Sequence, residues 1–233
     1  MHGVQEQTTD AVEEPGPSPE PREAGASLPP QSWPVRALIG AVCGLAWACA
    51  LRAYMEQLAG TLSSFDWWGT FFAILMPGAL VGASLAAATS AASTHRRALR
   101  WAAASPLLLA GFVLMLPGAL VSLLTTGMGG GAIAVPLIGI AGGYVLAGRR
   151  RALRVVLGVV ALASLGAIVW TVPTVGDLPL KTPQGAWTAT MVASLLVVLM
   201  LAASIPFARL RRLPPRAPRG PAPATPGTPA ARS

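Results

Sequence analysis

Charge is scarce in this chain. Of its 233 residues, 11% are charged and 53% are hydrophobic, whereas roughly 25% of the residues in a typical soluble domain are charged. The chain has too few charged residues to cover a folded core with polar surface. We therefore expect lipid to be the solvent for much of the chain. The net charge of +8 does not indicate nucleic acid as a partner, because the arginines flank apolar segments, where membrane topology already explains them.

Groups that could bind a metal or carry out chemistry are scarce too. The cysteines, Cys43 and Cys49, would point about 120° apart on a helix, so we expect two small buried apolar residues and no disulfide. The histidines, His2 and His95, lie outside the apolar runs. No Asp, Glu, His or Lys lies in the middle of a run, where pumps and proton-coupled transporters usually have one. We therefore expect no metal, no cofactor and no enzymatic activity.

Six apolar runs occupy the middle of the chain. Each is close to the ~20 residues that a helix needs to cross a hydrocarbon core about 30 Å thick, and none shows the alternation of a barrel strand. The runs are 34–58, 67–88, 101–124, 128–147, 152–172 and 187–207. The sequence predicts an all-α integral membrane protein whose residues 33–210 form a six-transmembrane-helix bundle. Prolines inside the runs are expected to kink these helices rather than end them.

The two ends of the chain have compositions typical of disorder. Residues 1–32 are acidic and rich in proline, and residues 211–233 are rich in Pro, Ala and Arg. Neither segment can bury enough apolar surface to offset the loss of chain entropy on folding. We predict two disordered tails.

Basic and acidic residues alternate along the chain. Of the seventeen basic residues, all but Arg52 and Lys181 lie in or beside the tails or in the segments 95–100 and 149–154. The acidic residues beyond the N-terminal tail lie in the other segments and are Glu56, Asp66 and Asp177. Short arginine-rich loops stay in the cytoplasm. The pattern predicts a membrane protein with a cytoplasmic N-terminus and C-terminus.

Small residues four apart indicate how the helices pack, because they let two backbones approach in lipid. The expected contact positions are Gly40 and Gly44, Gly78 and Gly82, Gly139 and Gly143, and Gly118 with Ser122. The glycine-rich run 128–147 is expected to be thin and central.

Two stretches are similar at an offset of 40 residues. Residues 72–81 and 112–121 share the letters Pro-Gly-Ala-Leu-Val at their ends. An inverted pair of the transporter kind and a coincidence among favoured residue types both remain open.

A polar cluster is expected at the outer end of the first helix. Its candidate residues are Arg52, Tyr54, Glu56 and Asp66. One hypothesis pairs Arg52 with Glu56, four residues on, or with Asp66, and so closes the outer ends of the first two helices. The alternatives are a snorkelling arginine and a contact with an anion or a lipid headgroup.

Three stretches carry a resemblance. AWACALRAYMEQLAG at 46–60, FDWWGTF at 65–71 and LMPGALVG at 75–82 resemble uncharacterised multi-pass membrane proteins of high-GC Gram-positive bacteria. The resemblance covers roughly the first four helices. It implies a location in the bacterial plasma membrane and a multi-pass topology, but no activity. We expect a non-enzymatic structural or interaction protein whose partners are the lipid bilayer and other membrane proteins. The alternative is a small transporter or channel subunit whose path is lined by the fourth helix and Arg52.

Overall fold

The computed structural model describes residues 32–60, 63, 65–90, 95–126 and 130–213. Within these ranges the chain forms helices and turns, and no strand. Apart from Ser32 and residues 211–213, the two tails predicted to be disordered lie outside the described residues.

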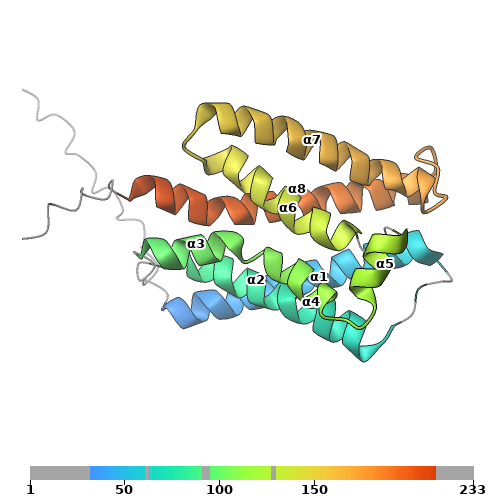
Figure 1. Cartoon of the computed structure of the whole chain (residues 1–233), viewed down its shortest axis with the longest axis horizontal. Helices are drawn as coiled ribbons and strands as arrows, with labels where there is room; N and C mark the ends of the chain where they lie inside the picture. Colours follow the sequence, from blue (N-terminus) through green and yellow to red (C-terminus); the bar gives the residue numbers. More distant parts are fainter. Residues whose placement is uncertain (1–31, 61–62, 64, 91–94, 127–129, 214–233) are drawn as a thin grey trace, which may run out of the picture. The chain divides into compact units, whose positions relative to one another are not determined.

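Nine helical elements follow one another in the described part of the chain (Figure 1). They are α1 (Trp33–Ala59), the π-helix η2 (Trp67–Leu75), α2 (Met76–Ala87), α3 (Arg96–Ala104), α4 (Leu107–Leu114), α5 (Ala119–Thr126), α6 (Gly130–Ala147), α7 (Arg151–Thr174) and α8 (Pro183–Arg212). Five segments are long and apolar enough to cross a membrane: α1, η2 with α2, α6, α7 and α8. A sixth is reached only if α3 and α4 are counted together.

The run 101–124, predicted to be one kinked span, is broken into separate helices. The axes of α3 and α4 differ by 56°, and the bend lies at Ser105 and Pro106, where proline lacks an N–H and its ring displaces the preceding turn. A second break separates α4 from α5 at Pro117 and Gly118. Gly118 has a φ of +78°, a conformation that glycine adopts readily and other residues avoid. In place of the six expected spans, the described residues form five segments that are long and apolar enough to cross a membrane, and one broken segment.

The second span begins as a π-helix and continues as an α-helix. Pro77 lies in the first turn of α2, where an α-helical turn before it would bring its ring against the carbonyl four residues back. The wider turn of η2 relieves this crowding. Aromatic pairs four residues apart cover the π-helix: Trp67 stacks on Phe71 at 4.6 Å between ring centroids, and Trp68 meets Phe72 edge-on at 5.6 Å.

The helix α8 ties the bundle together by packing against α1, α2, α3, α6 and α7. The two largest helix interfaces are those of α1 with α2 and of α6 with α8. The main core cluster draws its side chains from α1, α6, α7 and α8, with Leu51, Ile138, Val172 and Leu196 among them. The expectation that 128–147 is central agrees with the contacts of α6, although α8 has more helical neighbours.

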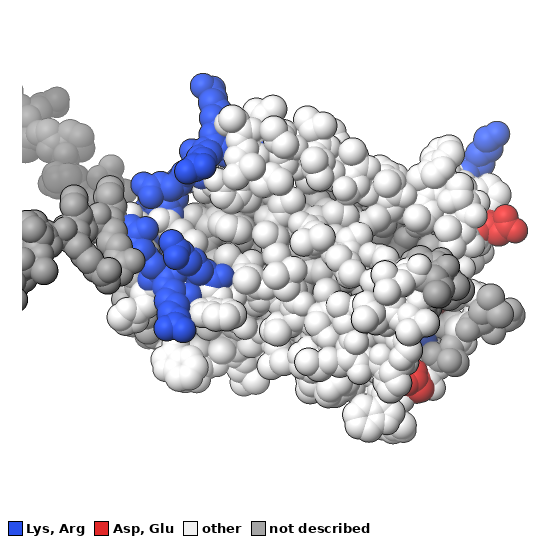
Figure 2. Space-filling model, in the orientation of Figure 1, with Lys and Arg blue, Asp and Glu red and all other residues white. Residues whose placement is uncertain are grey.

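Opposite charges lie at opposite ends of the bundle. Apart from Arg52, the arginines of the described residues gather where α2, α6 and α8 end and where α1, α3 and α7 begin (Figure 2). The acidic side chains lie at the other end, together with Arg52 and Lys181. Each long helix thus runs from one charged end to the other, and charge marks the two ends of the bundle.

Candidate functional site

The glycines of α1 and α2 bring the two backbones into direct contact. A Cβ on Gly82 would lie 2.8 Å from the Cα of Gly44 and 2.9 Å from its nitrogen, and a Cβ on Gly78 would lie 2.9 Å from the Gly44 carbonyl oxygen. Gly40 faces Gly82 equally closely, since its added Cβ would lie 3.0 Å from the Gly82 carbonyl carbon. Only the methyl groups of Ala86 and Ala48 lie against the glycines at these positions.

A second close approach joins α6 to α8. A Cβ on Gly139 would lie 2.6 Å from the side chain of Leu199, and one on Gly143 would lie 2.7 Å from the backbone of Ala203. Gly142, which the four-residue spacing did not single out, lies as closely against Met200. Gly118 differs: a Cβ there would meet nothing within 4 Å. It forms a turn, which corrects the expectation of a helix contact at this position.

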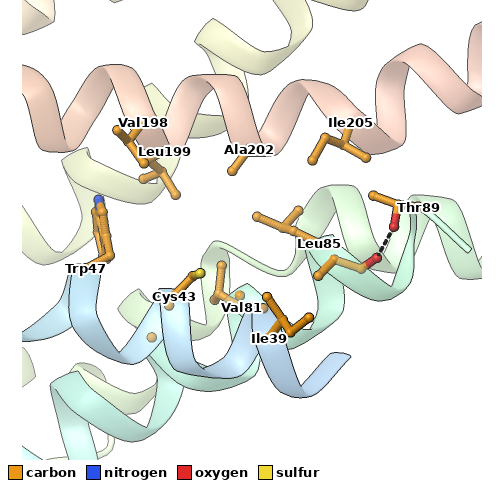
Figure 3. Close-up of a pocket in the computed structure, with 15 residues that line it drawn as sticks. Ile39, Cys43, Trp47, Val81, Leu85, Thr89, Val198, Leu199, Ala202 and Ile205 are labelled. Atoms are coloured by element: carbon orange, nitrogen blue, oxygen red, sulfur yellow. Dashed lines mark hydrogen bonds between the residues drawn. The ribbon is translucent and has the colours of Figure 1, made fainter. Parts of the chain in front are cut away.

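An apolar groove of about 290 Å³ lies beside the α1–α2 contact, between those helices and α8. The side chains of Val198, Ala202 and Ile205 on α8 face those of α1 and α2 across it (Figure 3). Trp47 lies at one end and Thr89 at the other. The lining side chains are apolar apart from the Thr89 hydroxyl, the thiol of Cys43 and the indole N–H of Trp47.

Both cysteines are free and exposed on the surface of the bundle. The prediction that no disulfide joins Cys43 and Cys49 is confirmed. The prediction that they are buried is wrong, because the small residues that α1 buries against α2 are its glycines and Ala48.

Hydrogen bonds close both ends of the groove. At the end that lies near the middle of the bundle, the indole nitrogen of Trp47 donates to the Leu195 carbonyl oxygen at 2.9 Å and joins α1 to α8. At the basic end, Arg36 Nη1 donates to the Thr89 carbonyl oxygen at 3.1 Å. Arg209 Nη2 donates to the same oxygen. Two arginines from opposite ends of the sequence therefore meet at one carbonyl group.

The other helices that end at the basic end of the bundle are capped in a similar way. Arg154 Nε donates to the Val145 carbonyl oxygen at 2.6 Å, near the end of α6. Arg96 Nη2 donates to the Leu213 carbonyl oxygen at 3.3 Å, just after α8. The last carbonyls of a helix carry partial negative charge, which cations stabilise. These arginines therefore satisfy helix termini in addition to marking one side of the protein.

At the opposite end of the bundle, Arg52 is buried, with 7% of its surface exposed. Its Nη2 donates to the Ser63 hydroxyl at 3.0 Å, and its guanidinium carbon lies 4.1 Å from the centre of the Phe65 ring. The carboxylate of Asp66 accepts the Gly69 N–H at 2.7 Å and caps η2, while the Glu56 side chain is exposed. Arg52 thus connects α1 to the segment before η2 through Ser63 and Phe65.

Tyr54 faces a different neighbour. Its hydroxyl lies 3.0 Å from the hydroxyl of Thr171 on α7. The Thr171 hydroxyl donates its single proton to the Ile168 carbonyl oxygen at 2.6 Å, so Tyr54 is the donor to Thr171. Arg52 and Tyr54 are two residues apart, about 200° around the helix. Arg52 and Tyr54 therefore reach different neighbours.

The chemistry available in these places is binding by hydrogen bonds, positive charge and apolar contact. In the ranges that the structure describes, no three His, Cys, Asp or Glu side chains lie close enough together to hold a metal ion. The basic end of the groove places two guanidinium groups next to an apolar lining, an arrangement suited to an amphipathic anion. No family model, no curated protein and no solved structure matches this chain.

Proposed function

We propose that this chain is a multi-pass protein of the bacterial plasma membrane that acts as a non-enzymatic structural or interaction protein. The observation that carries the membrane location is the apolar outer surface of the long helices. On α7, Leu162 and Val159 are 71% and 65% exposed, and the helix is apolar along most of its length. Soluble proteins rarely expose apolar patches of more than a few hundred Å², so lipid is the environment that such a helix favours.

The separation of charge supports an orientation in which both tails are cytoplasmic. Arginine is retained on the cytoplasmic side of bacterial membranes, and the arginine-rich ends of α2, α6 and α8 lie together (Figure 2). Both tails adjoin this end of the helical bundle in sequence, because α1 begins there and α8 ends there.

Reporter fusions test the orientation directly. A reporter that fluoresces only in the cytoplasm is expected to be active when it is fused after Arg100, Arg154 or Arg212. A fusion after Asp177 is the matched control and is expected to be inactive, because this loop lies at the acidic end. Activity of an export-dependent enzyme at any of the three arginine positions would refute the topology.

The lining of the cavities supports interaction rather than transport. The groove at α8 and a cavity of about 740 Å³ between α6 and α7 are both lined without a charged side chain. The larger cavity has only Tyr144 and Ser164 as polar side chains. A path for ions or polar solutes would need polar groups along it, whereas helices that bind lipid or other helices need small and apolar surfaces.

Extraction with surrounding lipid tests the interaction function. The tagged chain, released from native membranes by a polymer that keeps the lipid in place, is expected to migrate with other membrane proteins at a defined stoichiometry. An untagged culture is the control for adventitious capture. The same chain purified alone and reconstituted in vesicles is expected to leave ion and solute permeability unchanged. Specific permeation by the purified chain would contradict the proposal and favour a transporter or channel.

A further inference from the structure

We propose that the groove between α1, α2 and α8 holds one acyl chain of an anionic phospholipid, and that Arg36 and Arg209 bind its phosphate. This inference rests on the proposed membrane location. It goes beyond that location by assigning the chain a lipid-binding site and naming the class of lipid.

Charge at the mouth of the groove favours an anion. Arg36 and Arg209 donate to the same carbonyl oxygen, so two positive charges lie close together. Among the described residues, the acidic side chains Glu56, Asp66 and Asp177 all belong to the segments at the other end of the bundle. The end of α2 supplies only about half a negative charge. The phosphodiester of a phospholipid carries one negative charge and would compensate most of the rest.

The donor geometry also suits a phosphate. Each guanidinium has five N–H donors, and the bonds to the Thr89 carbonyl engage one nitrogen of each. Planar guanidinium groups bind phosphate with parallel hydrogen bonds. Basic pockets between helices on the cytoplasmic side are a recognised way of binding anionic headgroups.

The groove continues from this charged mouth toward the middle of the bundle. Ile39 lies one helical turn after Arg36, and Ile205 lies one turn before Arg209; both line the groove (Figure 3). From Arg36 to Trp47, α1 rises about 16 Å at 1.5 Å per residue. One leaflet of the hydrocarbon core is about 15 Å thick. The groove therefore has the length of a single leaflet.

Lipid in the bilayer can reach the groove from the side. Ile39 and Val198, on opposite walls, are 48% and 52% exposed. An acyl chain can enter laterally between α1 and α8 without passing through the bundle. The hydrogen bond from Trp47 to the Leu195 carbonyl then limits how deep the chain reaches.

Thermal stability of the full-length protein in detergent tests the site. Phosphatidylglycerol is expected to raise the melting temperature more than phosphatidylcholine with the same acyl chains, and inorganic phosphate is expected to raise it less than phosphatidylglycerol. The double variant Arg36→Gln with Arg209→Gln should lose the difference between the two lipids. The matched control, Arg97→Gln with Arg211→Gln, removes the same charge from exposed side chains at the same end and should keep it.

A third variant separates the groove from the charges. Ala202→Leu fills the groove and leaves both arginines in place, so it should reduce the effect of phosphatidylglycerol. If the double arginine variant does not fold, Ala202→Leu still tests the site. The lipid that each protein retains is then counted by native mass spectrometry. Equal stabilisation by both lipids, equal loss in the control pair, or an equal effect of inorganic phosphate would overturn the inference. A chain that stays in the soluble fraction when cells are broken without detergent would instead refute the proposed membrane location.

Discussion

Replacing Gly82 by alanine is expected to force α1 and α2 apart. The new Cβ would lie 2.8 Å from the Cα of Gly44, while ordinary van der Waals contact begins near 3.4 Å. The Gly40 carbonyl oxygen would lie closer still, and all of these atoms belong to the backbone and cannot rotate away. The helices must therefore separate by at least about 0.6 Å, the difference between the two distances. Overpacking of this kind typically costs about 1–3 kcal/mol.

A matched variant isolates that cost. Gly166→Ala makes the same change inside α7, where the new Cβ would have nothing within 4 Å. Both substitutions improve helix propensity by about 1 kcal/mol, so this gain cancels in the comparison. We expect Gly82→Ala to be less stable than Gly166→Ala by about 1–3 kcal/mol.

The assay is an unfolding titration with a denaturing detergent in mixed micelles, followed by circular dichroism. If Gly82→Ala cannot be recovered folded while Gly166→Ala folds well, Gly82→Ala is the less stable variant, as predicted. Equal free energies of unfolding for the two variants would refute the direct backbone contact.

Two further predictions use the same titration. Trp47→Phe removes the hydrogen bond to the Leu195 carbonyl while keeping an aromatic ring, and it should lower the free energy of unfolding by about 0.5–1.5 kcal/mol; no loss would show that this bond does not hold α1 to α8. Arg52→Leu and Phe65→Leu should be non-additive by about 0.5–2 kcal/mol, because a cation and a ring interact only when both are present. Strict additivity would show that the ring does not stabilise Arg52.

Local sequence predicted the long helices well and the broken segment poorly. The run 34–58 differs by one residue at each end from α1. The stretches 72–81 and 112–121 end in the same five residues, yet Pro77 and Gly78 lie inside a continuous span while Pro117 and Gly118 form a turn. The stretches also differ in their neighbours, since Gly78 lies against α1, whereas a Cβ added to Gly118 would meet nothing within 4 Å. Packing, rather than the residues themselves, decides whether the Pro-Gly pair continues or ends a helix.

The polar residues also divide into what the sequence predicted and what packing decided. The sequence indicated that Arg52 needs a partner near the end of α1, because a buried guanidinium is costly without one. It could not name Ser63 and Phe65 as contacts of Arg52, since the path of the connecting chain after α1 decides which groups come within reach. Asp66 caps η2, a role that depends on where that helix begins.

The sequence by itself determined the lengths of the apolar helices, their alternating direction through the charges between them, and the glycines at which two helices could approach. These properties follow from the rise and periodicity of a single helix and from the cost of burying charge in lipid. Only the tertiary structure decided which helices meet and therefore that Arg36, Thr89 and Arg209 converge at the end of an apolar groove. Helical periodicity fixes the faces of one helix, whereas the neighbours across a face depend on how closely the backbones pack.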